Sequence, residues 1–263
     1  MLRAYEIEQA LFDWAPCSLA EDWDNVGLLC GRADKEVARV LVALDPFEDV
    51  AEEAIRLGAD AIVTHHPLIF VAPHEVTDRT SVGRTILALA RADIAAINAH
   101  TNLDCAVGGV NDTLAQRLGL TDVRLIGPEK TDAQGRTCGL LRAGTVKETD
   151  FREFAARVKA ALGCPGLRFV DAGRPVRFVA VGGGACAGEM PDAADAGCDT
   201  FVTADVRYNQ FWDAHDLGIN LIDAGHFYTE DPVCGVLAEF LRARFPDLRV
   251  IRSKAHRDVM QFL

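Results

Sequence analysis

Short apolar runs alternate along the first half of the chain with segments whose apolar residues recur at helical spacing. The runs VLVAL, AIVT and IAAIN predict strands at 40–44, 61–64 and 94–98. Between them, a helix is expected to end at Gly58, and residues 81–92 predict a second helix. Strands that alternate with helices are typical of βαβ units, so we predict an α/β fold with a largely parallel sheet.

The start of the first of these helices carries a capping signal. Asp45 is followed by Pro46, which suits the first helical position, and by Glu48 three residues after the aspartate. We therefore expect Asp45 to cap this helix. In the second half, Asp150 and Glu153 form the same kind of capping box before an apolar helical face.

The second half of the chain repeats the plan of the first half. Two stretches, 42–66 and 179–205, share one order of elements. Each runs from a strand through a helical stretch to the pattern G-x-D-x-φ-V-T, where φ is an apolar residue. The stretches 94–100 and 219–226 both end in Asn or Asp, Ala and then a histidine. We infer an internal duplication that gives two similar α/β domains, with mixed sheets flanked by helices.

The order of these repeats predicts the domain boundaries. The first domain is expected to comprise residues 1–128 and 226–263, and the second residues 129–225. The polar stretch KTDAQGRT at 130–137 is the best candidate for the boundary between them.

Composition limits the classes of partner. The 263-residue chain is 49% hydrophobic, and its 27 Lys and Arg against 39 Asp and Glu give a net charge of −12. Duplex nucleic acid is an unlikely partner for such an acidic chain, because phosphate binding needs a basic face. A small anionic ligand held by a metal ion or by backbone N–H groups is still possible.

The cysteines and the apolar segments indicate a cytoplasmic protein. None of the eight cysteines is spaced as C-x-x-C, and scattered cysteines without a secretory signal fit a reducing compartment. The N-terminus has no apolar signal region, and no apolar stretch reaches membrane-spanning length.

Three polar clusters directly follow predicted buried strands: THHP at 64–67, NAHTNLD at 98–104 and DAGHFYTE at 223–230. Ligands of open α/β sheets bind at the carboxyl ends of the strands, so the three clusters are expected to meet at one edge.

These clusters contain three imidazoles and two carboxylates with mixed nitrogen and oxygen donors, namely His65, His66, Asp104, His226 and Glu230. Such a set suits zinc, iron or manganese better than calcium or magnesium. Five ligands exceed the needs of one open tetrahedral ion. Two divalent ions about 3.5–4 Å apart with a bridging carboxylate would use all five.

Other interpretations of these residues stay open at this point. A histidine at a strand end is usually hydrogen-bonded or solvated without any metal. We expect His100 to contact the ligands or the substrate and Cys105 to be an ordinary buried residue. His74, His215 and His256 are expected on the surface. The glycine-rich stretch 182–188 predicts a tight turn whose N–H groups could also bind an anion.

Taken together, several blocks carry a family resemblance. WDNVGL, THHPLIF, AHTNLD, GGVND and GHFYTE occur in this order between residues 23 and 230. With them the chain resembles the Nif-three-like family of dinuclear-metal proteins, whose members are often described as GTP cyclohydrolase 1 type 2 homologues.

The resemblance implies two α/β domains, a homohexameric toroid and two divalent ions on the five residues given above, with Glu230 as the bridge. It implies a hydrolase in which a metal-activated water opens the purine imidazole ring of a nucleotide substrate, and His100 is the candidate proton shuttle. A metal-dependent phosphoesterase or amidohydrolase is the alternative enzyme, and a non-catalytic metal-binding toroid is the alternative without turnover. Asn209 stands where many relatives would be expected to have a histidine, which puts proton transfer at that position in doubt.

Overall fold

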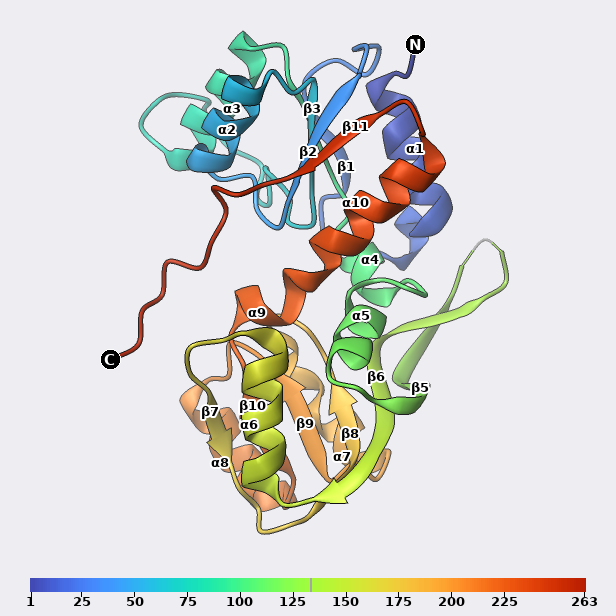
Figure 1. Ribbon diagram of the computed structural model, residues 1–263, viewed down its shortest axis with the longest axis vertical. Helices are drawn as coiled ribbons and strands as arrows, with labels where there is room; N and C mark the ends of the chain where they lie inside the picture. The colour runs from blue at the N-terminus through green and yellow to red at the C-terminus, as the bar shows by residue number, and fades with distance from the viewer. Residues whose placement is uncertain (133) are drawn as a thin grey trace. The chain divides into compact units, whose positions relative to one another are not determined.

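The computed structural model describes residues 1–132 and 134–263 (Figure 1). The chain forms two compact units, which are described here one at a time. The first unit comprises Met1–Leu103 and Val233–Asp258, and the second comprises Asp104–Pro232 and Val259–Leu263. Within the described ranges, every helix is too short or too polar to cross a membrane.

The first unit is built on a five-stranded sheet. Its strands, in spatial order, are β1 (Gly27–Cys30), β4 (Ala95–Asn98), β3 (Ala61–Thr64), β2 (Arg39–Ala43) and β11 (Arg249–Arg252). All neighbours pair in parallel except β1, which runs antiparallel to β4 at the edge. Parallel pairing explains the apolar runs in the sequence, because strands covered on both faces bury every side chain.

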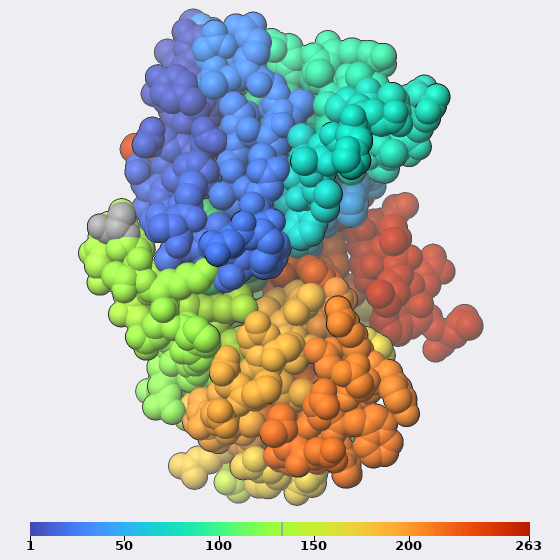
Figure 2. All heavy atoms as spheres, turned by 180° about the vertical axis from the view of Figure 1, so that it is seen from behind, coloured from blue at the N-terminus to red at the C-terminus, as the bar shows by residue number. Residues whose placement is uncertain are grey.

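Helices cover both faces of this sheet. Leu41 and Ile62 lie in one core with the apolar sides of α2 (Glu48–Leu57) and α3 (Ser81–Arg91). Figure 1 shows α1 (Ala4–Trp14) and α10 (Pro232–Arg244) on the opposite side of the sheet. From behind, the blue and cyan segments of this unit make one continuous surface (Figure 2).

The start of α2 differs from the sequence prediction. The helix begins at Glu48, its N-cap is Phe47, and no side chain caps it. The prediction that Asp45 caps this helix is therefore wrong, because its carboxylate is bound by two histidines instead. The capping prediction for Asp150 is confirmed, since its side chain accepts from the N–H groups of Arg152 and Glu153.

The second unit contains a six-stranded mixed sheet. Its strands, in spatial order, are β5 (Thr121–Thr131), β6 (Thr137–Thr149), β8 (Val176–Val181), β9 (Thr200–Thr203), β10 (Asn220–Asp223) and β7 (Arg168–Val170). The central strands β8, β9 and β10 are parallel to one another, and the remaining pairings are antiparallel.

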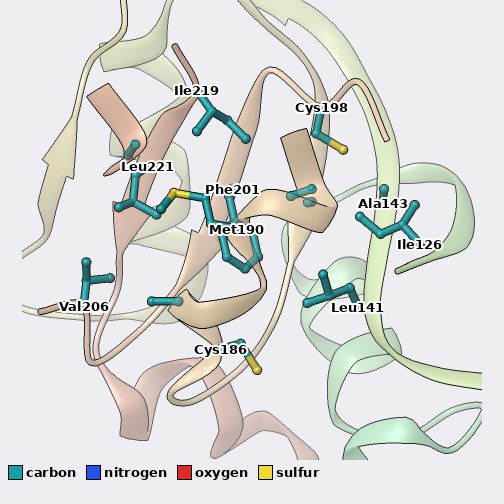
Figure 3. Packing of buried hydrophobic residues seen from close by; sticks show 14 residues of the cluster. Ile126, Leu141, Ala143, Cys186, Met190, Cys198, Phe201, Val206, Ile219 and Leu221 are labelled. Carbon is teal, nitrogen blue, oxygen red and sulfur yellow. The ribbon is translucent and has the colours of Figure 1, made fainter. Parts of the chain in front are cut away.

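The central strands of this sheet bury alternate residues on its two faces. Phe201 and Leu221 pack on Met190 of α7 (Met190–Asp195) and Ala214 of α8 (Tyr208–Leu217), as Figure 3 shows for three of these residues. The neighbouring positions in sequence face the opposite core, with the apolar sides of α5 (Val110–Arg117) and α6 (Phe151–Leu162). Period-two alternation with two apolar sets is what a doubly covered strand requires.

The predicted fold class of mixed sheets flanked by helices is confirmed. Each unit has three consecutive parallel strands side by side, β2–β3–β4 in the first and β8–β9–β10 in the second. This agreement supports the duplication, which stays a hypothesis, as do the domain boundaries after residues 128 and 225. The polar stretch 130–137 lies at the turn between β5 and β6, and its residue 133 is outside the described residues.

Phe201 offers a test of the second unit's core, because its ring is fully buried between α7 and α8. Phe201→Ala is expected to lower the free energy of unfolding by about 3–5 kcal/mol, through lost burial and the cavity left behind. Tyr208→Ala is the control, since this ring is 80% exposed on α8 and its loss is expected to change stability by less than about 0.5 kcal/mol. Chemical denaturation measures both, and equal effects would contradict the packing described here.

Candidate metal centre

In the first unit, three neighbouring parallel strands deliver polar side chains to one edge of the sheet. Thr64 at the end of β3 is in register with Asn98 at the end of β4. His65 and His66 therefore continue from β3 beside His100, which follows β4. Each of the three histidines has one ring nitrogen that lies within 4.8 Å of a ring nitrogen of the other two.

The orientation of each imidazole is fixed through its Nδ1 atom. His65 Nδ1 lies 2.9 Å from the Ala99 carbonyl oxygen, which can only accept. His66 Nδ1 lies 2.7 Å from Asp45 Oδ1, and His100 Nδ1 lies 2.7 Å from Asp24 Oδ1. Metal-binding histidines are typically oriented in this way, with Nε2 as the ligand atom.

A second histidine binds the same carboxylate as His66. His256 Nε2 lies 3.0 Å from Asp45 Oδ2, and its side chain is only 5% exposed. The prediction that His256 lies on the surface is therefore wrong. The buried Glu53 accounts for its position, because it accepts from the backbone N–H groups of Lys254 and Ala255 and so fixes the C-terminal segment.

The two orienting aspartates of this unit are ionised. Burial opposes the charged form of Asp24, but hydrogen bonds from His100 and Thr101 outweigh it and hold the pKa of this carboxyl well below its usual value. The same balance applies to Asp45, where burial is outweighed by the bonds to His256 and His66 and the pKa is again well below normal. Both carboxylates are therefore negatively charged at neutral pH, which makes the neighbouring imidazoles stronger electron donors.

The second unit has a comparable arrangement at the ends of its parallel strands. Asp205 follows β9, and His226 follows β10 at the start of the short helix α9 (His226–Glu230). One helical turn places His226 Nε2 2.9 Å from Glu230 Oε2, while His226 Nδ1 lies 2.8 Å from Asp205 Oδ2. Asp205 takes a left-handed backbone conformation, with φ 51°.

These contacts shift the pKa values of His226 and Asp205. Burial disfavours the charged imidazole of His226, but the bonds to Asp205 and Glu230 prevail and raise its pKa to about 11. The bond to His226 lowers the pKa of Asp205. A divalent cation would compete with a proton for this histidine, because a metal ligand must be the neutral imidazole.

The glycine-rich turn after β8 closes against α9. A Cβ on Gly184 would lie 2.0 Å from Glu230 Oε1 and 3.1 Å from His226 Nε2, so only glycine leaves room for these groups. The predicted tight turn is confirmed. The N–H groups of Gly183 and Gly184 donate to Asn111 Oδ1 and Thr229 Oγ1, so these two bind side chains of the protein and not an anion.

Asp104 lies with Glu230 in the second unit. One carboxylate oxygen of Asp104 lies within 4.8 Å of one carboxylate oxygen of Glu230. The two residues are only 7% and 4% exposed. Asn111 fixes this arrangement by donating to the Asp104 carbonyl. Burial, followed by these two carboxylates, raises the pKa of the neighbouring Cys186 thiol well above its usual value.

The remaining histidines and Asn209 have no part in these groups. His74, His215 and Asn209 are exposed, and Cys105 is buried as expected. The sequence analysis missed the orienting carboxylates Asp24, Asp45 and Asp205. Asp45 and Asp205 each stand two residues after the end of a strand, which is the signal that could have found them.

Comparison with known proteins identifies the family. The model of the Duf34/NIF3 (NGG1p interacting factor 3) family matches residues 2–259. The chain belongs to the Duf34/NIF3 family. The resemblance seen in the sequence blocks is thereby confirmed.

Relatives and solved structures that resemble this chain span nearly its whole length. It is 40% identical over 271 residues to a GTP cyclohydrolase 1 type 2 homolog of Streptomyces coelicolor, covering 98% of this chain and 93% of that one. It is 34% identical over 267 residues to a homolog of the same name from Clostridium perfringens, covering 100% of both chains. A crystal structure of a Bacillus cereus protein related to NIF3 is 28% identical, with a TM-score of 0.90 over 100% of this chain and 99% of that one.

The buried histidines and carboxylates of this Duf34/NIF3 protein could hold a metal ion. Their donors, their charge and their oriented rings all suit a divalent cation.

Gly184→Ala tests the fit between the glycine turn and α9. The new methyl group would strain a left-handed residue and displace the Glu230 carboxylate, so we expect a loss of about 1–3 kcal/mol in stability together with weaker metal retention. Gly188→Ala is the matched control in the same glycine-rich stretch, because apart from its own local backbone no heavy atom lies within 4 Å of its Cβ position. Thermal unfolding and elemental analysis measure the two effects, and indistinguishable variants would contradict this geometry.

Asp45→Asn tests the orienting role of the carboxylates. Loss of the negative charge behind His66 is expected to weaken metal affinity by about 10- to 100-fold while the fold persists. Asp216→Asn is the control, because this aspartate lies 3.1 Å from His215 Nδ1 in an otherwise similar pair whose side chains are 79% and 66% exposed. Competition with a chromogenic chelator gives the affinities. Parent-like affinity in Asp45→Asn would show that this carboxylate does not tune the site.

Proposed function

We propose that this protein is a metal-dependent hydrolase of the GTP cyclohydrolase 1 type 2 kind. In this proposal His65, His66, Asp104, His226 and Glu230 bind two divalent ions, with Glu230 as the bridge. One observation supports this proposal most directly: His65, His66 and His226 each have a hydrogen-bond acceptor at Nδ1. The two carboxylates of the set are buried. Such groups are costly to bury unless a counter-charge or a cation compensates them.

The donor set supports zinc, iron or manganese as the resident ions. Neutral imidazoles and carboxylates are good ligands for all three, whereas calcium and magnesium prefer oxygen ligands alone. Bound divalent ions of this type lower the pKa of a coordinated water toward about 7 and polarise the bond to be cleaved.

The chain's own residues have distinct parts in this proposal. Asp45 and Asp205 orient the ligands His66 and His226 and increase their basicity. His100 holds or moves a proton at Nε2, since Asp24 engages its other nitrogen at 2.7 Å. A histidine so oriented can pass a proton to the leaving nitrogen as the purine imidazole ring opens.

We also propose the quaternary structure that the family resemblance implies, a homohexameric toroid in the cytoplasm. Light scattering during size-exclusion chromatography measures this directly. A mass near six times the 28.5 kDa chain is expected, and a monomer would contradict it.

The metal stoichiometry tests the proposed centre. Protein purified without chelator is expected to contain about two divalent ions per chain. His65→Ala and Glu230→Ala are then each expected to lose most of the metal, because the proposal has all five ligands bind the same pair of ions. His74→Ala is the control, since this histidine is exposed.

Two results would contradict this centre. If the variants each lose one ion and retain the other, His65 and Glu230 bind different ions and the proposed bridge is refuted. A parent that takes up no zinc, manganese or ferrous iron would refute the metal centre altogether.

The metal-loaded parent should release formate from GTP, and His100→Gln is expected to reduce this rate by about 10²- to 10⁴-fold with its metal retained. Metal binding without formate release would refute this activity. Hydrolysis of a phosphate ester or amide by the same preparation would then identify the alternative enzyme, and no turnover would identify a metal-binding assembly.

A further inference from the structure

Two large aromatic side chains of the first unit stand exposed beside His100. Trp23 is 61% exposed and Phe70 is 52% exposed. Their ring centroids are 5.7 Å apart, and they lie 6.3 Å and 6.1 Å from the centroid of the His100 ring. We call Trp23 and Phe70 the aromatic pair.

The loops that carry the aromatic pair are fixed to one another. Asn25 Nδ2 donates to the Ile69 carbonyl at 2.6 Å, which joins the segment after Trp23 to the segment before Phe70. Asn98 Nδ2 donates to the Asn25 carbonyl at 3.1 Å, which ties the same loop to the end of β4. The exposure of the rings is therefore imposed by a hydrogen-bonded framework and not by loose loops.

Asp24 strengthens this framework at the residue next to Trp23. Its carboxylate accepts from the Thr101 N–H at 3.0 Å and lies 2.7 Å from His100 Nδ1. The residue that orients His100 thus also sets the position of the neighbouring Trp23. These hydrogen bonds hold the aromatic pair next to the polar residues Asp24 and His100.

The aromatic surface leads directly to the histidines of the candidate metal centre. The His100 ring centroid lies 5.2 Å from that of His65 and 5.4 Å from that of His66. A small molecule held on the aromatic pair would therefore have one edge at His100, with His65 and His66 beyond it. Exposed aromatic faces favour flat, polarisable groups, because stacking gains dispersion and excludes water over the whole ring.

We propose that Trp23 and Phe70 bind the planar ring of a nitrogen heterocycle, such as a nucleobase, and position it beside His100. The inference deepens the proposed function, because it assigns the residues that would recognise the ring to be opened. The planes of the aromatic pair are inclined at 63°, so a ligand ring would stack by one face on one of the two rings and leave its edge nitrogens and carbons accessible to His100. Recognition through ring faces also predicts weak discrimination between different bases, because every base offers the same kind of surface.

The test compares two ligands that differ only in the ring. Guanosine 5′-monophosphate and ribose 5-phosphate are titrated into the metal-loaded protein by calorimetry. We expect ribose 5-phosphate to bind at least about tenfold more weakly, the effect of one stacked base. Trp23→Leu and Phe70→Leu should each weaken binding of the nucleotide by about tenfold, without changing the binding of ribose 5-phosphate.

Two controls separate ring stacking from a loss of structure. Trp23→Phe keeps a flat ring and is expected to retain most of the affinity that Trp23→Leu loses. Tyr208→Leu removes a ring that is 80% exposed on α8 of the second unit and should leave nucleotide binding unchanged. Metal content is measured in every variant, and each should equal the parent.

Four outcomes would overturn the inference. The parent could bind the two ligands equally, or it could bind neither of them. Both leucine variants could keep the nucleotide affinity of the parent, or those variants could change their oligomeric state. The last would mean that a second copy of the chain covers the aromatic pair. Ring-dependent nucleotide binding without formate release from GTP would refute the proposed reaction and leave this inference standing.

Discussion

The structure depends on one constraint, the burial of histidine and carboxylate side chains where parallel strands end. Such groups lower the stability of a fold unless each finds a partner, because they lose their hydration. Four histidines have such a partner, because each has a hydrogen-bond acceptor at Nδ1: His65, His66, His100 and His226. That solution also fixes the orientation of every ring, so the requirement of folding produces the ring orientation that metal ligands typically have.

The same constraint extends beyond the ligands to segments far away in sequence. Asp45 binds His256 as well as His66, and Glu53 accepts from backbone N–H groups just before His256. The C-terminal segment is therefore part of the arrangement behind the first unit's histidines. An aspartate expected to cap a helix has a different role, because two imidazoles compete successfully for its carboxylate.

The two units reach similar chemistry with different residues. In the first, the ends of β2 and β3 bring Asp45 to His66. In the second, the ends of β9 and β10 bring Asp205 to His226. The pairing of a carboxylate with a histidine at neighbouring strand ends is thus common to both, which fits two α/β domains of one ancestral plan. The second unit also has a glycine turn closed against α9, which leaves room for Glu230.

The sequence by itself determined the elements, the fold class, the family and the strand ends as the place of the candidate site. These follow from local regularities: apolar runs and helical periods mark strands and helices, and polar clusters directly after β3, β4 and β10 stand out against them. Only the tertiary structure decided which residues orient the histidines. Asp24 and His100 are 76 positions apart, and no sequence period links them. His256 likewise looks like a surface residue until the packing of the C-terminal segment buries it beside Asp45. Periodicity reports which side of an element faces a core, whereas partners brought together by chain folding depend on register and packing between distant segments.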